Sequence, residues 1–166
     1  MLMTVTNRLG IRALTDADLV FIKGLRDNPM CARYQRWESS SEEHLRGMID
    51  GHREDVLFSE KEIQRFLIVK HDDTPVGTLT LFVTPDEGCI TLGITIAPTH
   101  QRQGYARELL TTVCHSAHER FPTLELIALI HPDNTPSIRL FEQLGFTLDL
   151  YAESLHSLVY IKHPQK

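Results

Sequence analysis

The sequence Gln-Arg-Gln-Gly-Tyr-Ala-Arg, residues 101–107, follows an alternating apolar strand and opens a helix. Backbone N–H groups at the start of a helix lack partners inside it, and they bind anions, phosphates above all. Gly104 lets the backbone approach an anion closely, and Arg102 and Arg107 add guanidinium groups that suit phosphate. The stretch predicts a pyrophosphate cradle, and an ordinary strand–helix connection with solvated arginines is the alternative.

Four residues elsewhere could handle a proton or an acceptor amine. His131 follows a predicted strand and can titrate near neutrality, or it is a solvated residue at a strand end. Glu38, next to Trp37, could bind or deprotonate an amine, or be a solvated loop carboxylate. Tyr34 and Trp37 could hold a cation on their ring faces, or form plain core. A metal site is not expected, because no third ligand accompanies the two histidines on the helix after Gly104.

The elements that must position these residues follow from hydrophobic periodicity. Strands are expected over residues 8–14, 65–70, 77–84, 89–97, 124–130, 146–151 and 155–163, and helices after Thr15, after Ser40, after Gly104 and over residues 135–145. Residues 30–40 are expected to be irregular, and the nearly continuous apolar run 124–130 predicts a strand covered on both faces. This order predicts a mixed α/β (α+β) fold, with a mostly antiparallel twisted sheet and helices on both faces.

Composition bounds the class of protein. The chain has 166 residues, 42% of them hydrophobic, and a formal net charge of −5, which fits one globular domain over residues 1–166. A nucleic-acid partner is not expected, since nucleic-acid-binding domains are commonly basic. Three widely spaced cysteines are typical of reduced, cytoplasmic proteins, and no apolar run resembles a signal peptide or a membrane span. We therefore expect a cytoplasmic protein without a membrane partner.

Two motifs resemble those of a known superfamily. The sequence QRQGYA is similar to the Q/R-x-x-G-x-G/A signature of the GNAT acyl-CoA N-acyltransferases, and residues 127–146 resemble the Asn-x-x-Ser motif that follows it in that family. The N-terminal third is similar to the branch that contains ribosomal-protein N-terminal acetyltransferases. The resemblance covers nearly the whole chain. It implies a GNAT-like sheet with a splayed parallel strand pair, and an acetyl-CoA-dependent N-acetyltransferase that needs no metal.

The resemblance also implies roles for individual residues. The backbone of Ile94 and Ile96 would bind the pantetheine arm, the Ile96 N–H would polarise the thioester carbonyl, and the Asn134 amide would meet the pantetheine. The full set of implied coenzyme-binding residues is Ile94, Thr95, Ile96, Arg102, Gln103, Gly104, Tyr105, Ala106, Arg107, Asn134, Ser137 and Phe141. His131 and Glu38 are the candidate proton handlers, and Tyr34, Trp37 and Glu38 the candidate acceptor-binding residues.

The chain departs from the family pattern at two positions. Phe141 stands where many relatives have a tyrosine that can donate a proton, and Thr91 stands where many have a glutamate. These departures keep a second function open, a non-catalytic acyl-CoA-binding sensor, and a third is an interaction domain without a nucleotide. The acceptor stays open among protein N-termini, polyamines, aminoglycosides and amino acids. Relatives are often dimers, so a homodimer is possible.

Overall fold

The computed structural model describes residues 3–37, 40–58 and 64–165. Its strands and helices, in chain order, are β1 (Met3–Thr4), β2 (Leu9–Arg12), α1 (Leu19–Asp27), α2 (Pro29–Ala32), α3 (Glu42–Gly51), β3 (Gln64–His71), β4 (Thr74–Thr84), β5 (Cys89–Ile96), α4 (Tyr105–Arg120), β6 (Glu125–Ile130), α5 (Thr135–Gln143), β7 (Thr147–Ala152) and β8 (Ser157–Lys162). In this part of the chain no helix is long and apolar enough to cross a bilayer.

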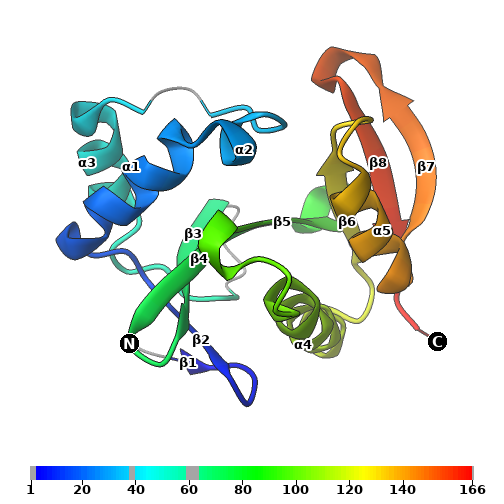
Figure 1. Ribbon diagram of the computed structural model, residues 1–166. Helices are drawn as coiled ribbons and strands as arrows, with labels where there is room; N and C mark the ends of the chain where they lie inside the picture. Colours follow the sequence, from blue (N-terminus) through cyan, green and yellow to red (C-terminus); the bar gives the residue numbers. More distant parts are fainter. Residues whose placement is uncertain (1–2, 38–39, 59–63, 166) are drawn as a thin grey trace.

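One eight-stranded sheet organises the molecule, in the order β1-β2-β3-β4-β5-β6-β8-β7 (Figure 1). The pair β5 and β6 is parallel, and the other neighbours are antiparallel. The parallel register runs from Cys89 opposite Glu125 to Leu92 opposite Ala128 and stops there, although both strands continue. The strands therefore separate over their last residues. This confirms the predicted mostly antiparallel sheet with a splayed parallel pair.

Helices cover both faces of the sheet because neighbouring residues of a strand point to opposite sides. Leu67 and Val69 of β3 enter the large core that α4 completes. Phe66 and Ile68 enter a second core with the apolar residues of α1 and α3. Figure 1 shows α1 and α3 on one side of the sheet and α4 on the other. The predicted two-sided cover is therefore confirmed.

The carboxylate of Asp18 fixes the start of α1 against β2. Arg12 donates two hydrogen bonds to it, of 2.7 and 2.8 Å, and the Thr15 backbone N–H donates a third of 2.8 Å. Asp18 is only 1% exposed. Burial works against ionisation, but the bonds from Arg12 and Thr15 outweigh it and lower the pKa of Asp18. These contacts form a capping box, with a 3₁₀ turn (Asp16–Asp18) leading into α1.

Two predictions about local structure were wrong. Residues 30–40 are not all irregular, because Asn28 accepts a hydrogen bond from the Met30 N–H and starts the short helix α2 with Pro29 in its first turn. The run 124–130 is not covered on both faces, since Leu129 is 44% exposed. Leu129 lines a cavity beside the divergence of β5 and β6.

Candidate functional site

The predicted cradle is a helix N-terminus that no side chain caps. Gly104 precedes α4 with φ 78° and makes no side-chain capping bond, so the first N–H groups of α4 remain available to an anion. Arg102 also has a positive φ, 62°. A Cβ atom placed on Gly104 would meet only the Arg8 Nη2 atom, at 3.6 Å. The space beside the Gly104 Cα atom is therefore open apart from the Arg8 guanidinium.

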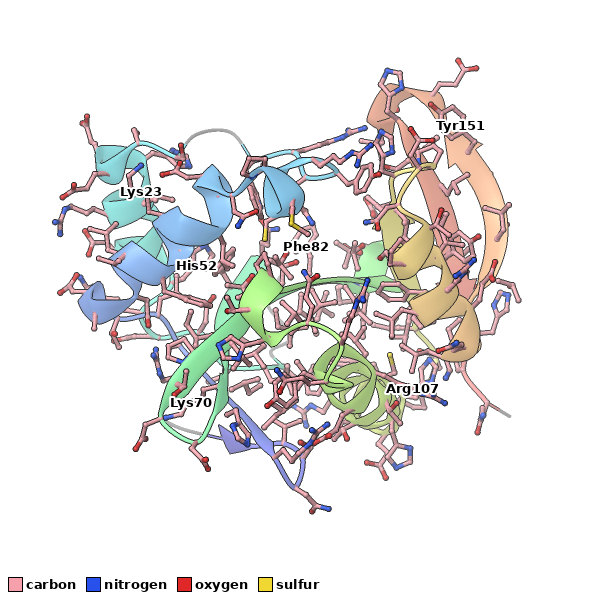
Figure 2. The ribbon with its side chains drawn as sticks, in the orientation of Figure 1. Lys23, His52, Lys70, Phe82, Arg107 and Tyr151 are labelled. Carbon is pink, nitrogen blue, oxygen red and sulfur yellow. The ribbon has the colours of Figure 1, made fainter. Side chains whose placement is uncertain are left out.

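The cradle residues divide into cations and structural residues. Arg102 and Arg107 are exposed and make no ion pair with the described residues. Arg107 is labelled in Figure 2. Tyr105 is only 6% exposed and stacks on the His71 ring, with 5.6 Å between centroids. Tyr105 can therefore serve a ligand only through its backbone, as can the neighbouring Ala106, which packs against the large core.

Arg8, which the sequence analysis missed, braces the cradle from the β1–β2 turn. Its guanidinium lies 4.8 Å from the Tyr105 ring centre, and its Nη2 atom donates to the Gln103 carbonyl at 3.1 Å. It also forms a 2.6 Å ion pair with Glu108 in the first turn of α4. This pair offsets a carboxylate that would otherwise repel an anion at the helix start. Bonds from Thr6 and Arg8 lower the pKa of Glu108, which keeps the carboxylate ionised and paired.

The edge of β5 exposes backbone groups where β6 has diverged. The Ala97 N–H donates to the Val76 carbonyl at 2.8 Å, and N–H groups alternate in direction along an antiparallel strand. The N–H groups of Ile94 and Ile96 therefore point away from β4, toward the gap, and that of Thr95 points to β4. The Ile96 carbonyl accepts a 2.9 Å bond from the Gln101 side chain. Gln101 is a second residue that the sequence analysis missed, although it opens the signature motif.

The far side of the gap is formed by β6 and the start of α5. Asn134 is the N-cap of α5, and its Oδ1 atom accepts from the Ser137 N–H at 3.4 Å. Ser137 is therefore the capped residue and not the cap. Phe141 is 3% exposed and packs edge-to-face on Phe146, with 5.0 Å between ring centroids. Asn134, Ser137, Phe141 and Thr91, which are distant in the sequence, all line one cavity.

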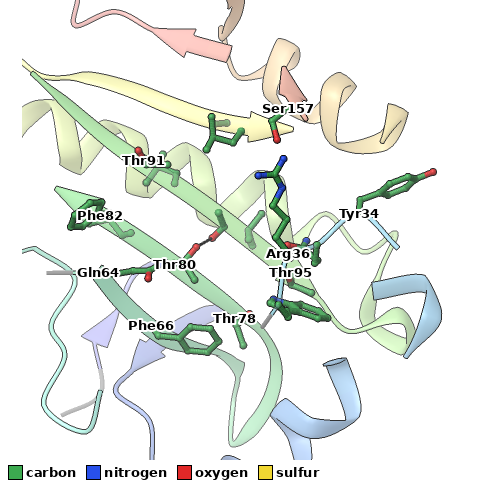
Figure 3. Close-up of a pocket in the computed structure, with 18 of the residues that line it drawn as sticks. Tyr34, Arg36, Gln64, Phe66, Thr78, Thr80, Phe82, Thr91, Thr95 and Ser157 are labelled. Atoms are coloured by element: carbon green, nitrogen blue, oxygen red, sulfur yellow. Dashed lines mark hydrogen bonds between the residues drawn. The ribbon is translucent and has the colours of Figure 1, made fainter. Parts of the chain in front are cut away.

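That cavity encloses about 830 Å³ between the sheet and the segment that joins α2 to α3 (Figure 3). Tyr34, Trp37 and His131 line it, and the Tyr34 and His131 rings lie 5.0 Å apart. Glu38, the other candidate of this segment, lies outside the described residues. Trp37 also packs beside Leu25, Cys31 and Ala97 in a small core.

Tyr34 and Trp37 each pack against an arginine side chain of the protein itself. The Arg33 guanidinium lies 5.1 Å from the Tyr34 ring centre, and that of Arg26 lies 5.5 Å from the Trp37 ring centre. The interpretation of these rings as open faces for a substrate cation is therefore not supported by the packing.

His131 and His52 both line the cavity, and their neutral rings carry the proton on different nitrogen atoms. The His131 Nδ1 atom accepts from the Asp133 backbone N–H at 3.1 Å, so the neutral ring carries its proton on Nε2. The His52 Nδ1 atom lies 2.7 Å from the Asp55 carboxylate, which also accepts the Phe66 N–H at 2.8 Å. Nδ1 of neutral His52 therefore carries the proton, and Nε2 can accept one. His52, labelled in Figure 2, is the C-cap of α3, and its ring centroid lies 6.1 Å from that of Phe66 in β3. The sequence analysis missed it.

A parallel pair that splays within an otherwise antiparallel sheet defines the class of protein. The fold is that of the acyl-CoA N-acyltransferases, as the resemblance implied. The family model described as "Acetyltransferase (GNAT) domain" matches residues 8–147. The chain belongs to the GNAT acetyltransferase family.

Three known proteins resemble the chain. The N-acetyltransferase YoaA of Bacillus subtilis (strain 168) is 28% identical over 144 residues, which are 85% of this chain and 80% of YoaA. RimL, a ribosomal L7/L12 α-N-protein acetyltransferase solved with coenzyme A, has a TM-score of 0.80, 17% identity and 98% coverage of both chains. Spermidine N-acetyltransferase from Vibrio cholerae, solved with coenzyme A and spermine, has a TM-score of 0.74, 21% identity and 93% coverage of both chains. At these identities the two solved structures share the fold.

Proposed function

We propose that this protein is an acetyl-CoA-dependent N-acetyltransferase that transfers an acetyl group to a primary amine. The observation that carries the proposal is one continuous segment, from the free β5 edge at Ile94 and Ile96 to the uncapped helix start at Gly104. A coenzyme needs both features, because its pyrophosphate is an anion and its pantetheine arm carries amide groups.

The chain's groups would divide the work as follows. The first N–H groups of α4, with Gln103, Arg102 and Arg107, would bind the pyrophosphate. The β5 edge and the Asn134 amide would bind the pantetheine arm, and the Thr95, Ser137 and Phe141 side chains would shape the slot around it. The Ile96 N–H would donate to the thioester carbonyl oxygen, where negative charge develops during attack.

The reaction forms a C–N bond, breaks the C–S bond and releases coenzyme A. The attacking amine loses a proton to a base. The candidates are His131 and the His52 Nε2 atom, which line the cavity, and Glu38, which is a candidate from the sequence alone. The leaving thiolate needs little help, because a thiol has a pKa of about 8.5. A phenylalanine at position 141 is therefore compatible with turnover.

The alternative is a non-catalytic acyl-CoA sensor, which Phe141 and Thr91 favour. Phe141 is packed on Phe146 and has no proton to give, and Thr91 has no carboxylate. Release of coenzyme A in the presence of amines separates the two functions. A cytoplasmic location, a small-molecule or peptide acceptor and a homodimer belong to the same proposal. Gel filtration tests the dimer.

Calorimetric titration with acetyl-CoA, and with free coenzyme A as comparison, tests the cradle. Gly104→Val should weaken binding at least about ten-fold by filling the anion's approach, a loss of about 1.4 kcal/mol. Gly88→Val is the matched control, because Gly88 has nearly the same backbone angles (φ 74°, ψ 23°) but precedes the opposite end of β5. Both variants should lose similar stability through the strained left-handed residue, and Gly88→Val should keep its affinity. Unchanged affinity in Gly104→Val would refute the cradle.

A further inference from the structure

Arg36 projects into the cavity from the segment between α2 and α3. Figure 3 shows its guanidinium reaching across the cavity toward Ser157 of β8. It makes no hydrogen bond or ion pair with any residue that the structure describes. A guanidinium offers five N–H donors in a planar fork that matches a carboxylate. Arg36 is exposed at the cavity, so its guanidinium is accessible to a ligand and no described residue competes for it.

The charges around Arg36 do not favour a cationic ligand. Among the described residues that line the cavity, Arg26 and Arg36 are cationic and Glu43 is the one carboxylate. This local balance is opposite in sign to the net charge of the chain, −5. A cleft whose walls carry an excess of one charge attracts ligands of the opposite charge.

The aromatic part of the wall brings one further cation close to the cavity, Arg33, which does not itself line it. Arg33 and Arg26 lie over the Tyr34 and Trp37 rings. The rings thus carry guanidinium groups where a substrate ammonium group would otherwise stack. A polyamine with several ammonium groups would meet like charges along this wall, and close like charges cost binding energy.

We infer that the acceptor is a primary amine that also carries a carboxylate, and that Arg36 binds this carboxylate. The inference rests on the proposed function and specifies its acceptor. Two kinds of molecule offer this chemistry, the N-terminus of a peptide with an acidic residue near it and a free amino acid. Arg36 would act as a specificity-determining residue that places the amine near the β5 edge.

The test compares acceptors that differ in one charge. Ala-Asp-Ala-Ala-amide and Ala-Asn-Ala-Ala-amide have the same size and the same N-terminal amine. For the free amino acid, L-alanine is compared with L-alaninamide. Both rates are expressed per neutral amine. The wild type should prefer the acidic member of at least one pair by about ten-fold or more in kcat/KM, as a charged hydrogen bond allows. The pair that shows the preference identifies the source.

Variants at two arginines test whether Arg36 causes the preference for the acidic acceptor. Arg36→Gln should reduce it to within about two-fold, and should leave the neutral member's kcat/KM and the KM for acetyl-CoA within about three-fold. Arg46→Gln is the control, because Arg46 pairs with Glu42 on the exposed side of α3 and does not line the cavity. Equal loss for both members of a pair, or a raised KM for acetyl-CoA in Arg36→Gln, would overturn the inference. So would a wild-type preference for spermidine.

Binding without turnover separates this inference from the proposed function. The protein saturated with coenzyme A is titrated with the N-acetylated Asp and Asn peptides and with N-acetylalanine and its amide. Tighter binding of an acidic member that Arg36→Gln abolishes would support the carboxylate site even if no acceptor were acetylated, and the catalytic proposal alone would fail. Acetylation without any acidic preference would refute the carboxylate site and leave the acetyltransferase intact.

Discussion

Gly77 of β4 lies directly opposite Ile96, whose backbone N–H we propose for catalysis. A side chain at position 77 would therefore press on this part of β5. A Cβ atom at Gly77 would lie 2.3 Å from the Thr95 carbonyl oxygen and 2.9 Å from the Ile96 Cδ1 atom. The first contact is with backbone, which cannot rotate away as a side chain does. Gly77→Ala must therefore move β5 relative to β4 at Ile96, the residue whose N–H we propose as the donor to the thioester.

The size of the effect follows from this distance. The Cβ–oxygen contact is about 1 Å shorter than an ordinary van der Waals contact. Displacing a catalytic group by about 1 Å can cost on the order of 100-fold in rate, or about 2.7 kcal/mol in the barrier. Overpacking of this kind also costs about 1–3 kcal/mol of folding stability. We expect kcat to fall about 100-fold in a protein that is still folded.

The assay combines thiol release with urea unfolding. Gly24→Ala is the control, since no atom lies within 4 Å of a Cβ placed at Gly24 in α1. It should leave kcat unchanged and stabilise the protein by about 0.5–1 kcal/mol. A folded Gly77→Ala protein with kcat within about three-fold of wild type would refute the role of the β5 backbone in polarising the thioester.

Two further predictions concern Phe141 and Asp18. Phe141→Tyr should leave kcat within a few-fold, because the thiolate leaves without an acid; a rise above about ten-fold would show that the natural chain lacks one. Asp18→Asn should lower the free energy of unfolding by about 3–5 kcal/mol near pH 7, because it leaves Arg12 without its buried partner. The folded-state pKa of Asp18 is lowered, so its contribution is complete above the unfolded pKa of about 3.9 and is lost as the pH falls through the folded value. Urea unfolding from pH 7 to pH 3 should show the two proteins converging, and a constant difference would contradict the pairing.

The features that the sequence predicted well are local ones. The β5–α4 turn follows from an alternating strand, a helical period and one glycine, all within 25 residues, and the structure has each of them. The start of α1 likewise follows from Thr15 and Asp18. In such cases the interacting groups are neighbours in the chain, so spacing alone specifies them.

Residue spacing alone does not specify the acceptor side, because that side depends on tertiary packing. Arg33 and Arg26 occupy the faces of Tyr34 and Trp37 only because α1, α2 and the following segment fold together. Arg36 and His52 carry no motif, although the spacing of His52 and Asp55 on a helix end could have drawn attention to them. The apolar run 124–130 resembled a doubly covered strand because a residue that borders a cavity can be as hydrophobic as one in a core.

The hydrogen bond from Gln101 to the Ile96 carbonyl makes the donor and the acceptor at the end of the open β5 edge unequal. The N–H of Ile96 remains available, while the carbonyl of the same residue already has a donor. At its last position the edge therefore offers a donor and little acceptor capacity. An amide chain bound along β5 is therefore favoured when it places an oxygen opposite the Ile96 N–H, and disfavoured when it places an N–H there. The Gln101 side-chain amide thus favours one direction for a chain bound along β5 before any ligand binds.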